Sequence, residues 1–244
     1  MLIASIATVM GRAHRAASAG REAAVQGEWT VPPPLTRVGP ALLAYASLGG
    51  PVDSLRVLER RVDAAILGAV EAPDRDRARD EWLARAGALA FPVWRFPSLD
   101  RDPSRYYLIG AQQSAVRGDT IGVRRIFAGI RAARRTIDAA DVALDAVYPE
   151  AWTLLAVGDT GAAIAWLDAA LTSVHAMTPE ALSEVAAPGA LVRAMALRAD
   201  LAASRRDPAT ASRWAGAVAV LWAEADSFHQ ATVQRMIAMA RVIE

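Results

Sequence analysis

The chain has 244 residues, of which 54% are apolar, so it can build a sizeable core and is not disordered along its whole length. Its 27 basic residues are all arginine and face 26 acidic ones, so the net charge of +1 gives no overall field toward nucleic acid or anionic membranes. The absence of cysteine excludes disulfides, thiolate metal sites and cysteine nucleophiles.

The first ten residues are apolar and are predicted to form an ordinary helix. Ala17-Ser18-Ala19 has the small residues of a signal-peptidase site, but no positive residue precedes the apolar run, and the charged segment 12–15 separates the two. No apolar stretch reaches the ~18 residues that a membrane span needs. We therefore expect a soluble, cytoplasmic chain.

The whole sequence has the pattern of an all-α protein. β-Branched and aromatic residues rarely alternate, whereas alanine, leucine and arginine dominate almost every segment. In chain order, helices are predicted at residues 2–10, 13–26, 41–48, 52–71, 75–89, 104–117, 120–136, 146–157, 160–176, 180–186, 189–204, 208–225 and 227–242.

The segment 52–71 shows the helical pattern clearly, because apolar and charged side chains occupy different faces. The apolar stripe consists of Leu55, Leu58, Val62, Ala65 and Ile66. The other face carries Arg56, Glu59, Arg60 and Asp63. The stripe must be buried by a neighbouring helix.

Two proline-rich stretches, residues 29–40 and 91–103, interrupt the helical pattern. Because proline is disfavoured in a helix interior, both are predicted to be ordered crossings or hinges. The second divides the chain into N-terminal helical hairpins at 1–90, a proline- and aromatic-rich crossing at 91–103 and C-terminal hairpins at 104–244.

The crossing and the residues after it are rich in aromatic side chains: Phe91, Trp94, Phe96, Tyr106 and Tyr107. They either line a groove between the two halves or pack the loop onto the helices, and packing is preferred. Four tryptophans farther along fall at core-like helical positions and are predicted to pack between hairpins: Trp152, Trp166, Trp214 and Trp222.

Three short turns repeat along the C-terminal half. Gly118-Asp119-Thr120, Gly158-Asp159-Thr160 and Arg206-Asp207-Pro208 each end one helical pattern and begin another. Glycine suits the left-handed backbone that ends a helix, aspartate can cap the next helix, and proline fits a first helical turn. A small residue lies seven positions before each turn, at Ala111, Ala151 and Ala199. The pattern predicts closely packed antiparallel hairpins.

The stretch 151–171 combines the end of one helix, the Gly158 turn and a helix with a small–large–small pattern at Ala163, Leu167 and Ala170. In this it resembles the tetratricopeptide repeat (TPR) family, although successive turns are 40 and 48 residues apart, longer than the ~34 of a regular TPR. The resemblance implies an α-α superhelix, a solenoid of TPR-like antiparallel helical hairpins.

The run 190–222, together with the paired Gly-Asp-Thr turns, is similar to the helical C-terminal region that follows the catalytic domain in some bacterial serine/threonine protein kinases. No kinase motif is present in the sequence. This similarity implies a sensor or docking region separated from its enzyme. A helical pattern that begins at Leu2 without a capping segment ahead of it favours the same interpretation.

The histidines give no pattern of a metal or catalytic site. None of His14, His175 and His229 is followed by a second histidine or a carboxylate at the i+3 or i+4 position of a helical metal site. Asp226-Ser227-Phe228-His229 contains the residue types of a triad, but a helix cap by the aspartate or the serine explains it better. The chain also lacks the lysine of a phosphate-binding loop, so no cofactor or metal is expected.

Two charged clusters have residue types that could form a binding site. Asp138, Asp141 and Asp145 lack the glycine and final glutamate of a calcium loop and are predicted to be caps and surface charges. The helix at 120–136 carries Arg124, Arg125, Arg131, Arg134 and Arg135. These arginines could hold phosphate, nucleic acid or an acidic peptide, but the nearly neutral chain favours a solvated face, and no nucleic-acid partner is expected.

These patterns predict a non-catalytic protein–protein interaction module rather than an enzyme. By analogy with stacked hairpins, a peptide or protein partner would bind a concave surface that contains Tyr107, Gln112, Trp152 and Arg198. One alternative is a regulatory region of a kinase or transcription regulator whose halves respond to a ligand. Another is a helical enzyme with a deep pocket of converging acidic or imidazole groups.

Overall fold

The computed structural model describes residues 10–13, 15–16, 18, 33–101, 105–134, 144–174, 182 and 184–241. Within this part of the chain every regular element is a helix and no residue forms a strand, so the predicted all-α class is confirmed. None of these helices is long and apolar enough to cross a membrane. The helices predicted at 2–10 and 13–26 lie largely outside the described residues.

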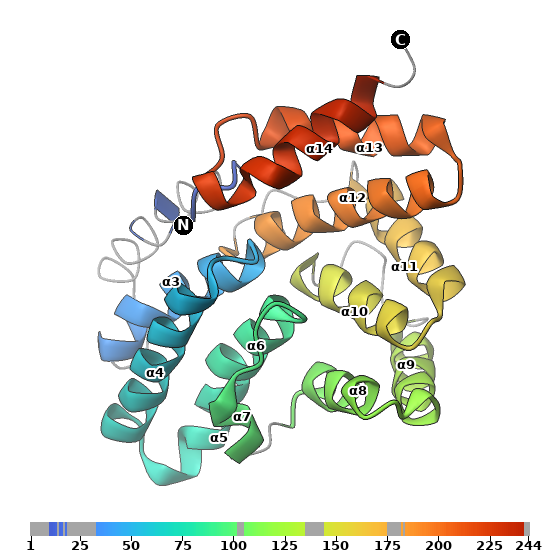
Figure 1. Ribbon diagram of the computed structural model, residues 1–244. Coiled ribbons are helices and arrows are strands. Elements are labelled where there is room, and N and C mark those ends of the chain that lie inside the picture. The colour runs from blue at the N-terminus through green and yellow to red at the C-terminus, as the bar shows by residue number, and fades with distance from the viewer. Residues whose placement is uncertain are drawn as a thin grey trace.

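The elements before and within the crossing are α3 (Pro33–Ser47), α4 (Val52–Ala69), the 3₁₀ turn η1 (Ala72–Asp74), α5 (Arg75–Arg79), the π-helical turn η2 (Asp80–Ala84), α6 (Arg85–Ala90) and α7 (Pro97–Arg101). The later elements are α8 (Tyr107–Val116), α9 (Thr120–Arg134), α10 (Leu144–Ala156), α11 (Thr160–Thr172), α12 (Ala187–Ser204), α13 (Pro208–Leu221), the 3₁₀ turn η6 (Ser227–His229) and α14 (Gln230–Ala240). Figure 1 shows their arrangement.

The three repeated turns join antiparallel pairs of helices, as predicted. Gly118, Gly158 and Arg206 have positive φ angles of 74°, 78° and 59°. The aspartate after each of them accepts a hydrogen bond from the backbone N–H three residues on, at 2.8 to 3.1 Å. At the last turn, hydrogen bonds from Thr210 lower the pKa of Asp207. These turns produce the hairpins α8–α9, α10–α11 and α12–α13.

The prediction of a crossing at residues 29–40 is wrong, because α3 begins at Pro33 and continues through Pro40. A proline in the first turn removes no hydrogen bond, since N–H groups there have no partner within the helix. Beyond Pro40 the helix is held by packing: Leu42 and Ala44 are fully buried. Gly39 contacts Trp82 so closely that a Cβ would lie 2.3 Å from the indole ring.

Helix α4 buries Leu55, Val62 and Ile66 as predicted, but Glu59 is also buried and does not face solvent. Its carboxylate accepts hydrogen bonds from the Trp94 indole at 3.2 Å and from the backbone and hydroxyl of Ser98 at 2.9 and 2.7 Å. Ser98, which lies 39 residues after Glu59, thus accounts for the burial of a residue on the charged face of α4. Through these hydrogen bonds Glu59 joins the crossing to α4.

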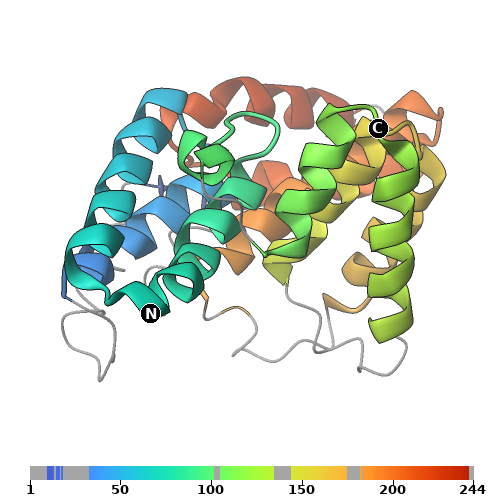
Figure 2. The same ribbon diagram turned by 90° about the horizontal axis from the view of Figure 1, so that it is seen from below.

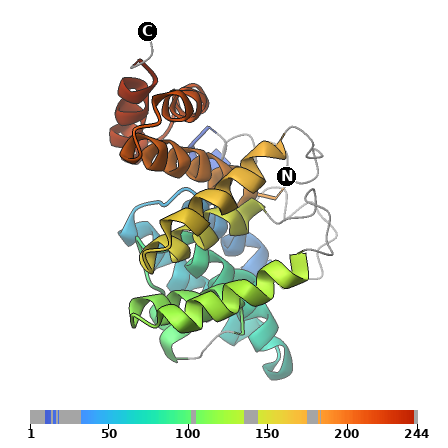
Figure 3. The ribbon, with the colours of Figure 1, turned by 90° about the vertical axis from the view of Figure 1, so that its right-hand side faces the viewer.

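The helices form a closed circuit of contacts. Helix α3 packs against α6, α6 against α10, α10 against α12, and α12 against α3. In an open superhelix each hairpin touches only its neighbours, so this closure departs from the stack that the TPR resemblance implies. Helices α4 and α9 lie on opposite sides of the molecule (Figure 2), and α13 and α14 form a layer beyond α12 (Figure 3).

One buried core extends across the crossing. Leu42 of α3 and Leu89 of α6 belong to the same cluster as Val147 of α10 and Val192 of α12. Gly11 contacts the loop between α13 and η6, because its carbonyl accepts a hydrogen bond from the Asp226 N–H at 3.0 Å. Residues far apart in sequence therefore meet where α3, α6, α10 and α12 converge.

Candidate functional site

Arg193 of α12 lies where the four helices converge and is only 7% exposed. Its Nη1 donates to the carbonyls of Ala46, Ser47 and Leu89 at 3.0, 3.3 and 2.8 Å. These carbonyls belong to the last turns of α3 and α6. Carbonyls in a last turn have no hydrogen-bond partner within their helix, and the helix dipole there favours a positive charge. The guanidinium carbon also lies 3.8 Å from the ring centre of Tyr148.

A cavity of about 260 Å³ lies beside Arg193. Side chains of α10, α12, α14 and η6 line it together with the α3–α4 turn and Val93 of the crossing. Its aromatic lining consists of Tyr148, Trp152, Trp222 and Phe228, with His229. This volume approaches the lower end of ligand-binding pockets, about 300 Å³. The cavity therefore fits a group of roughly amino-acid size.

The charges that line the cavity do not cancel. Asp200 and Arg235 form a two-pronged ion pair, with N–O distances of 3.1 and 3.0 Å, and both are partly exposed. Arg193 has no carboxylate partner among the described residues, since its hydrogen bonds go to three carbonyls. Two arginines and one aspartate leave the lining with a net positive charge.

His229 and Trp222 stack at the cavity, with ring centres 4.0 Å apart. Both are buried, and in the described part of the chain the Trp222 Nε1 and His229 Nε2 atoms have no hydrogen-bond partner. Burial, helped by the charge of Arg193, lowers the pKa of His229 to about 4. The imidazole is therefore neutral at pH 7.

The predicted helix cap at Asp226 is found only in part. Asp226 occupies the N-cap position of η6, but its side chain makes no cap hydrogen bond.

Two of the four residues predicted to contact a partner are engaged inside the protein. The Tyr107 hydroxyl donates to Glu150 Oε1 at 2.7 Å. Gln112 is 5% exposed, and its amide nitrogen donates to the Ala88 carbonyl at 3.1 Å. These contacts join α8 to α10 and to α6.

Of the other two predicted residues, one is engaged inside the protein and one lines the cavity. Arg198 is 8% exposed and forms a two-pronged ion pair with Asp168 of α11, at 2.7 and 3.2 Å. Trp152 is half-buried and lines the cavity, which none of the other three does. The structure thus brings only one of the four residues to the candidate site.

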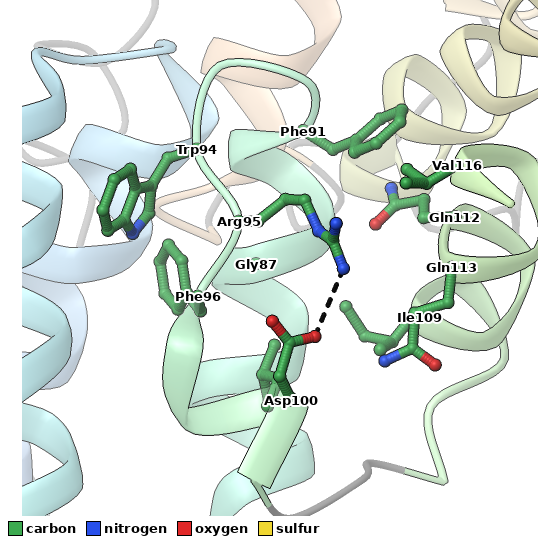
Figure 4. A pocket seen from close by; sticks show the side chains of 11 residues that line it. Gly87, Phe91, Trp94, Arg95, Phe96, Asp100, Ile109, Gln112, Gln113 and Val116 are labelled. Atoms are coloured by element: carbon green, nitrogen blue, oxygen red, sulfur yellow. Dashed lines mark hydrogen bonds and ion pairs between the residues drawn. The ribbon is translucent and has the colours of Figure 1, made fainter.

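A second hollow beside the crossing is much smaller. Its volume is about 30 Å³, room for about two water molecules. Phe91 and Phe96 line it and are buried, and Arg95 forms an ion pair with Asp100 at 3.3 Å in the same lining (Figure 4). The crossing aromatics therefore pack against the helices, which agrees with the preferred interpretation.

Asp145 is not a surface charge, contrary to the prediction. It is 7% exposed and pairs with Arg85 of α6, which also binds Glu184 at 2.7 Å. Burial alone would lower the pKa of Arg85, but the two carboxylates outweigh it and raise that pKa above its ordinary value. Asp138 and Asp141 lie outside the described residues. The partner 60 residues earlier in the chain explains why Asp145 is buried.

The arginine face of α9 is exposed at Arg124, Arg125 and Arg131. The Arg131 guanidinium lies 5.5 Å from the ring centre of Trp166. The side chains of Arg134 and Arg135 lie outside the description. Among the residues that are described, no three His, Asp or Glu side chains are grouped so that they could hold a metal ion; His14 and His175 fall in the undescribed segments.

Comparison of the chain with protein-family models, with curated proteins and with solved structures finds no match. Sequence reasoning also missed the centre of the candidate site, Arg193. Its carbonyl partners lie 104 to 147 residues earlier. The one local signal is the aromatic content of the C-terminal helices, and this pattern is also typical of packing between helices.

Proposed function

We propose that this protein is a non-catalytic binding module that anchors a peptide segment of a partner protein in the cavity beside Arg193. The observation that carries the proposal is a buried arginine at the edge of an aromatic cavity, which has no carboxylate partner in the described part of the chain. Aromatic side chains and arginine are the residues that most often dominate binding energy at protein interfaces. The TPR resemblance points to the same class of function.

Two features of the cavity support binding rather than catalysis. Asp200 is held by Arg235, so its carboxylate is engaged in an ion pair. His229 Nε2 is buried against neighbouring side chains, whereas a general base must reach the proton it abstracts. The helical hairpins act as a rigid frame in this proposal, and a concave superhelical surface is not required.

A second function, the sensor region of a kinase or transcription regulator, is favoured by one observation. Leu48 and Val93 line the cavity from the N-terminal half and the crossing, while Arg193 and His229 line it from the C-terminal half. A ligand there would contact both halves and could change the angle between them. Unchanged small-angle X-ray scattering on saturation with ligand would contradict this function.

Selection from peptide-display libraries on the full chain tests the main proposal. Trp152→Ala is expected to weaken binding of the selected peptides about 10-fold or more, because it removes an aromatic wall of the cavity. Val220→Ala is the matched control, since Val220 is 78% exposed and lies outside the cavity lining. Peptides that bind the wild type and Trp152→Ala equally, or the absence of any selected peptide, would contradict the proposal.

A further inference from the structure

The guanidinium of Arg193 uses only part of its hydrogen-bonding capacity. All three of its hydrogen bonds are made by Nη1, and its Nε–H and Nη2–H make none within the described residues. Neither nitrogen is among the buried unpaired atoms, so both remain accessible, and Arg193 lines the cavity. The Nε and Nη2 donors form the edge that binds both oxygens of a carboxylate at once.

The groups around Arg193 leave the Nε–Nη2 edge as the part of the guanidinium that a ligand can contact. The Tyr148 ring covers the guanidinium at 3.8 Å. Gly49 also lies against the guanidinium, since a Cβ built on it would be 3.2 Å from Cζ and 3.4 Å from both Nε and Nη2. Gly49 also has a φ of 66°, which disfavours a larger residue. A ligand therefore meets donors at the edge and not the flat face.

We infer that the cavity binds a carboxylate, and that the ligand is the C-terminal residue of the partner segment, with its terminal carboxylate on the Nε–Nη2 edge of Arg193 and an apolar side chain against Trp152, Trp222 and Phe228. This inference rests on the proposed function and names the chemistry of its partner.

Charge complementarity supports an anionic ligand. The one aspartate of the lining is paired with Arg235, and His229 is neutral at pH 7 because burial lowers its pKa to about 4. No side chain of the described residues thus neutralises the positive charge of Arg193. A carboxylate would both neutralise it and form charge-assisted hydrogen bonds with a guanidinium group that is itself buried.

The size and lining of the cavity favour a chain terminus over an internal acidic residue. A C-terminal residue brings its carboxylate and its side chain from the same Cα, and the rest of the peptide leaves in one direction. An internal aspartate or glutamate would need the chain to pass on both sides and would bring few apolar atoms. A volume of about 260 Å³ with aromatic walls fits one apolar residue with its carboxylate.

The test compares two display formats, one with free peptide C-termini and one in which the C-terminus is fused to the carrier. Binding peptides are expected from the free format only. Hexapeptides made from them are then titrated as acids and as C-terminal amides by calorimetry. The amides are expected to bind about 10- to 100-fold more weakly, because they lose charge-assisted hydrogen bonds.

Arg193→Lys keeps the charge but loses the planar edge, so it should weaken the acid about 10-fold and reduce the acid–amide difference. The matched control is Arg79→Lys, a similarly buried arginine that pairs with Asp63 outside the cavity lining, and it should change affinity less than about threefold. If Arg193→Lys does not fold, as judged by circular dichroism, the acid–amide comparison on the wild type decides alone.

The outcomes separate the inference from the proposed function. Equal binding of acids and amides, or equal selection from both formats, overturns the carboxylate while leaving a peptide-binding module. No peptide from either format overturns both. Benzoate and N-acetylleucine test the source of the carboxylate: if either binds as tightly as the hexapeptide acid, a small organic acid replaces the chain terminus as the ligand.

Discussion

Glu150 of α10 and Arg193 of α12 are both buried charges at helix interfaces, and the fold uses them differently. Each carboxylate oxygen of Glu150 accepts a hydrogen bond, from the Tyr107 hydroxyl at 2.7 Å and the Trp166 indole at 2.5 Å. Within the described residues, Arg193 bonds through one nitrogen and keeps two unused donor nitrogens beside a cavity. A buried charge that is fully bonded joins helices, whereas one with unused donors at a cavity is a candidate for ligand binding.

The largest expected effect is on stability at the fully bonded centre. Glu150→Ala should lower the free energy of unfolding by about 4 kcal/mol, because it removes two charge-assisted hydrogen bonds and opens a small void. Urea denaturation measures the loss. Peptide affinity measured on the remaining folded protein should stay unchanged. A loss below about 1 kcal/mol would remove the distinction between the two centres.

The next effect is the loss of stability in acid that His229, a residue of the cavity lining, should cause. Because the pKa of His229 falls from 6.5 to about 4 on folding, the unfolded chain takes up the proton first as the pH decreases. The contribution of this group is fully present above pH 6.5, decreases between pH 6.5 and 4, and should total about 3 kcal/mol.

His229→Phe isolates that contribution, since all other titrating groups remain. Urea denaturation of the wild type and the variant at a series of pH values should show that the variant loses less stability between pH 6.5 and 4. Parallel curves for the two proteins would mean that the imidazole is not held in its neutral form.

A smaller effect tests the predicted partner residue Tyr107. Tyr107→Phe should cost about 2 kcal/mol of unfolding free energy, because the buried Glu150 carboxylate loses a charge-assisted hydrogen bond. Thermal and urea unfolding measure this cost, and peptide titration should show no change. Weakened peptide binding with intact stability would instead restore the surface that the sequence predicts around Tyr107.

The smallest effect lies in the hairpin turns. Asp159→Ala and Asp207→Ala each remove a helix cap seen in the structure, and both should lower the melting temperature. For Asp159→Ala the cost in unfolding free energy should be about 1 kcal/mol. Differential scanning calorimetry of both variants measures these effects. Peptide binding should be unaffected, because neither residue lines the cavity. A change in affinity would show that the turns position the site.

Local rules explain what the sequence predicted well. The turns at Gly118, Gly158 and Arg206 could be found because a left-handed residue followed by a capping aspartate is a property of a few adjacent residues. The same rules failed at Pro33 and Pro40, where burial of the neighbouring side chains sustains a helix that local preference disfavours.

The candidate site depends on contacts that no local pattern carries. Glu59 and Asp145 are buried by partners 39 and 60 residues away, and Arg193 meets carbonyls more than 100 residues earlier. Trp152 was predicted to contact a partner and does line the cavity, but Tyr107, Gln112 and Arg198 are bonded within the protein. Whether a residue lines the cavity or is bonded inside the protein depends on how α3, α6, α10 and α12 pack into a closed circuit. The sequence periodicity does not specify this packing.

The most direct measurement is the NMR signal of the Arg193 Nε–H group, which Arg193→Lys removes and thereby assigns. On addition of a selected hexapeptide with a free C-terminus, this signal should shift strongly as the Nε–H begins to donate to the carboxylate, and the amide form should leave it almost unmoved. An Nε–H signal that stays in place while the acid peptide binds, or that shifts equally with the amide, would contradict a carboxylate site at Arg193.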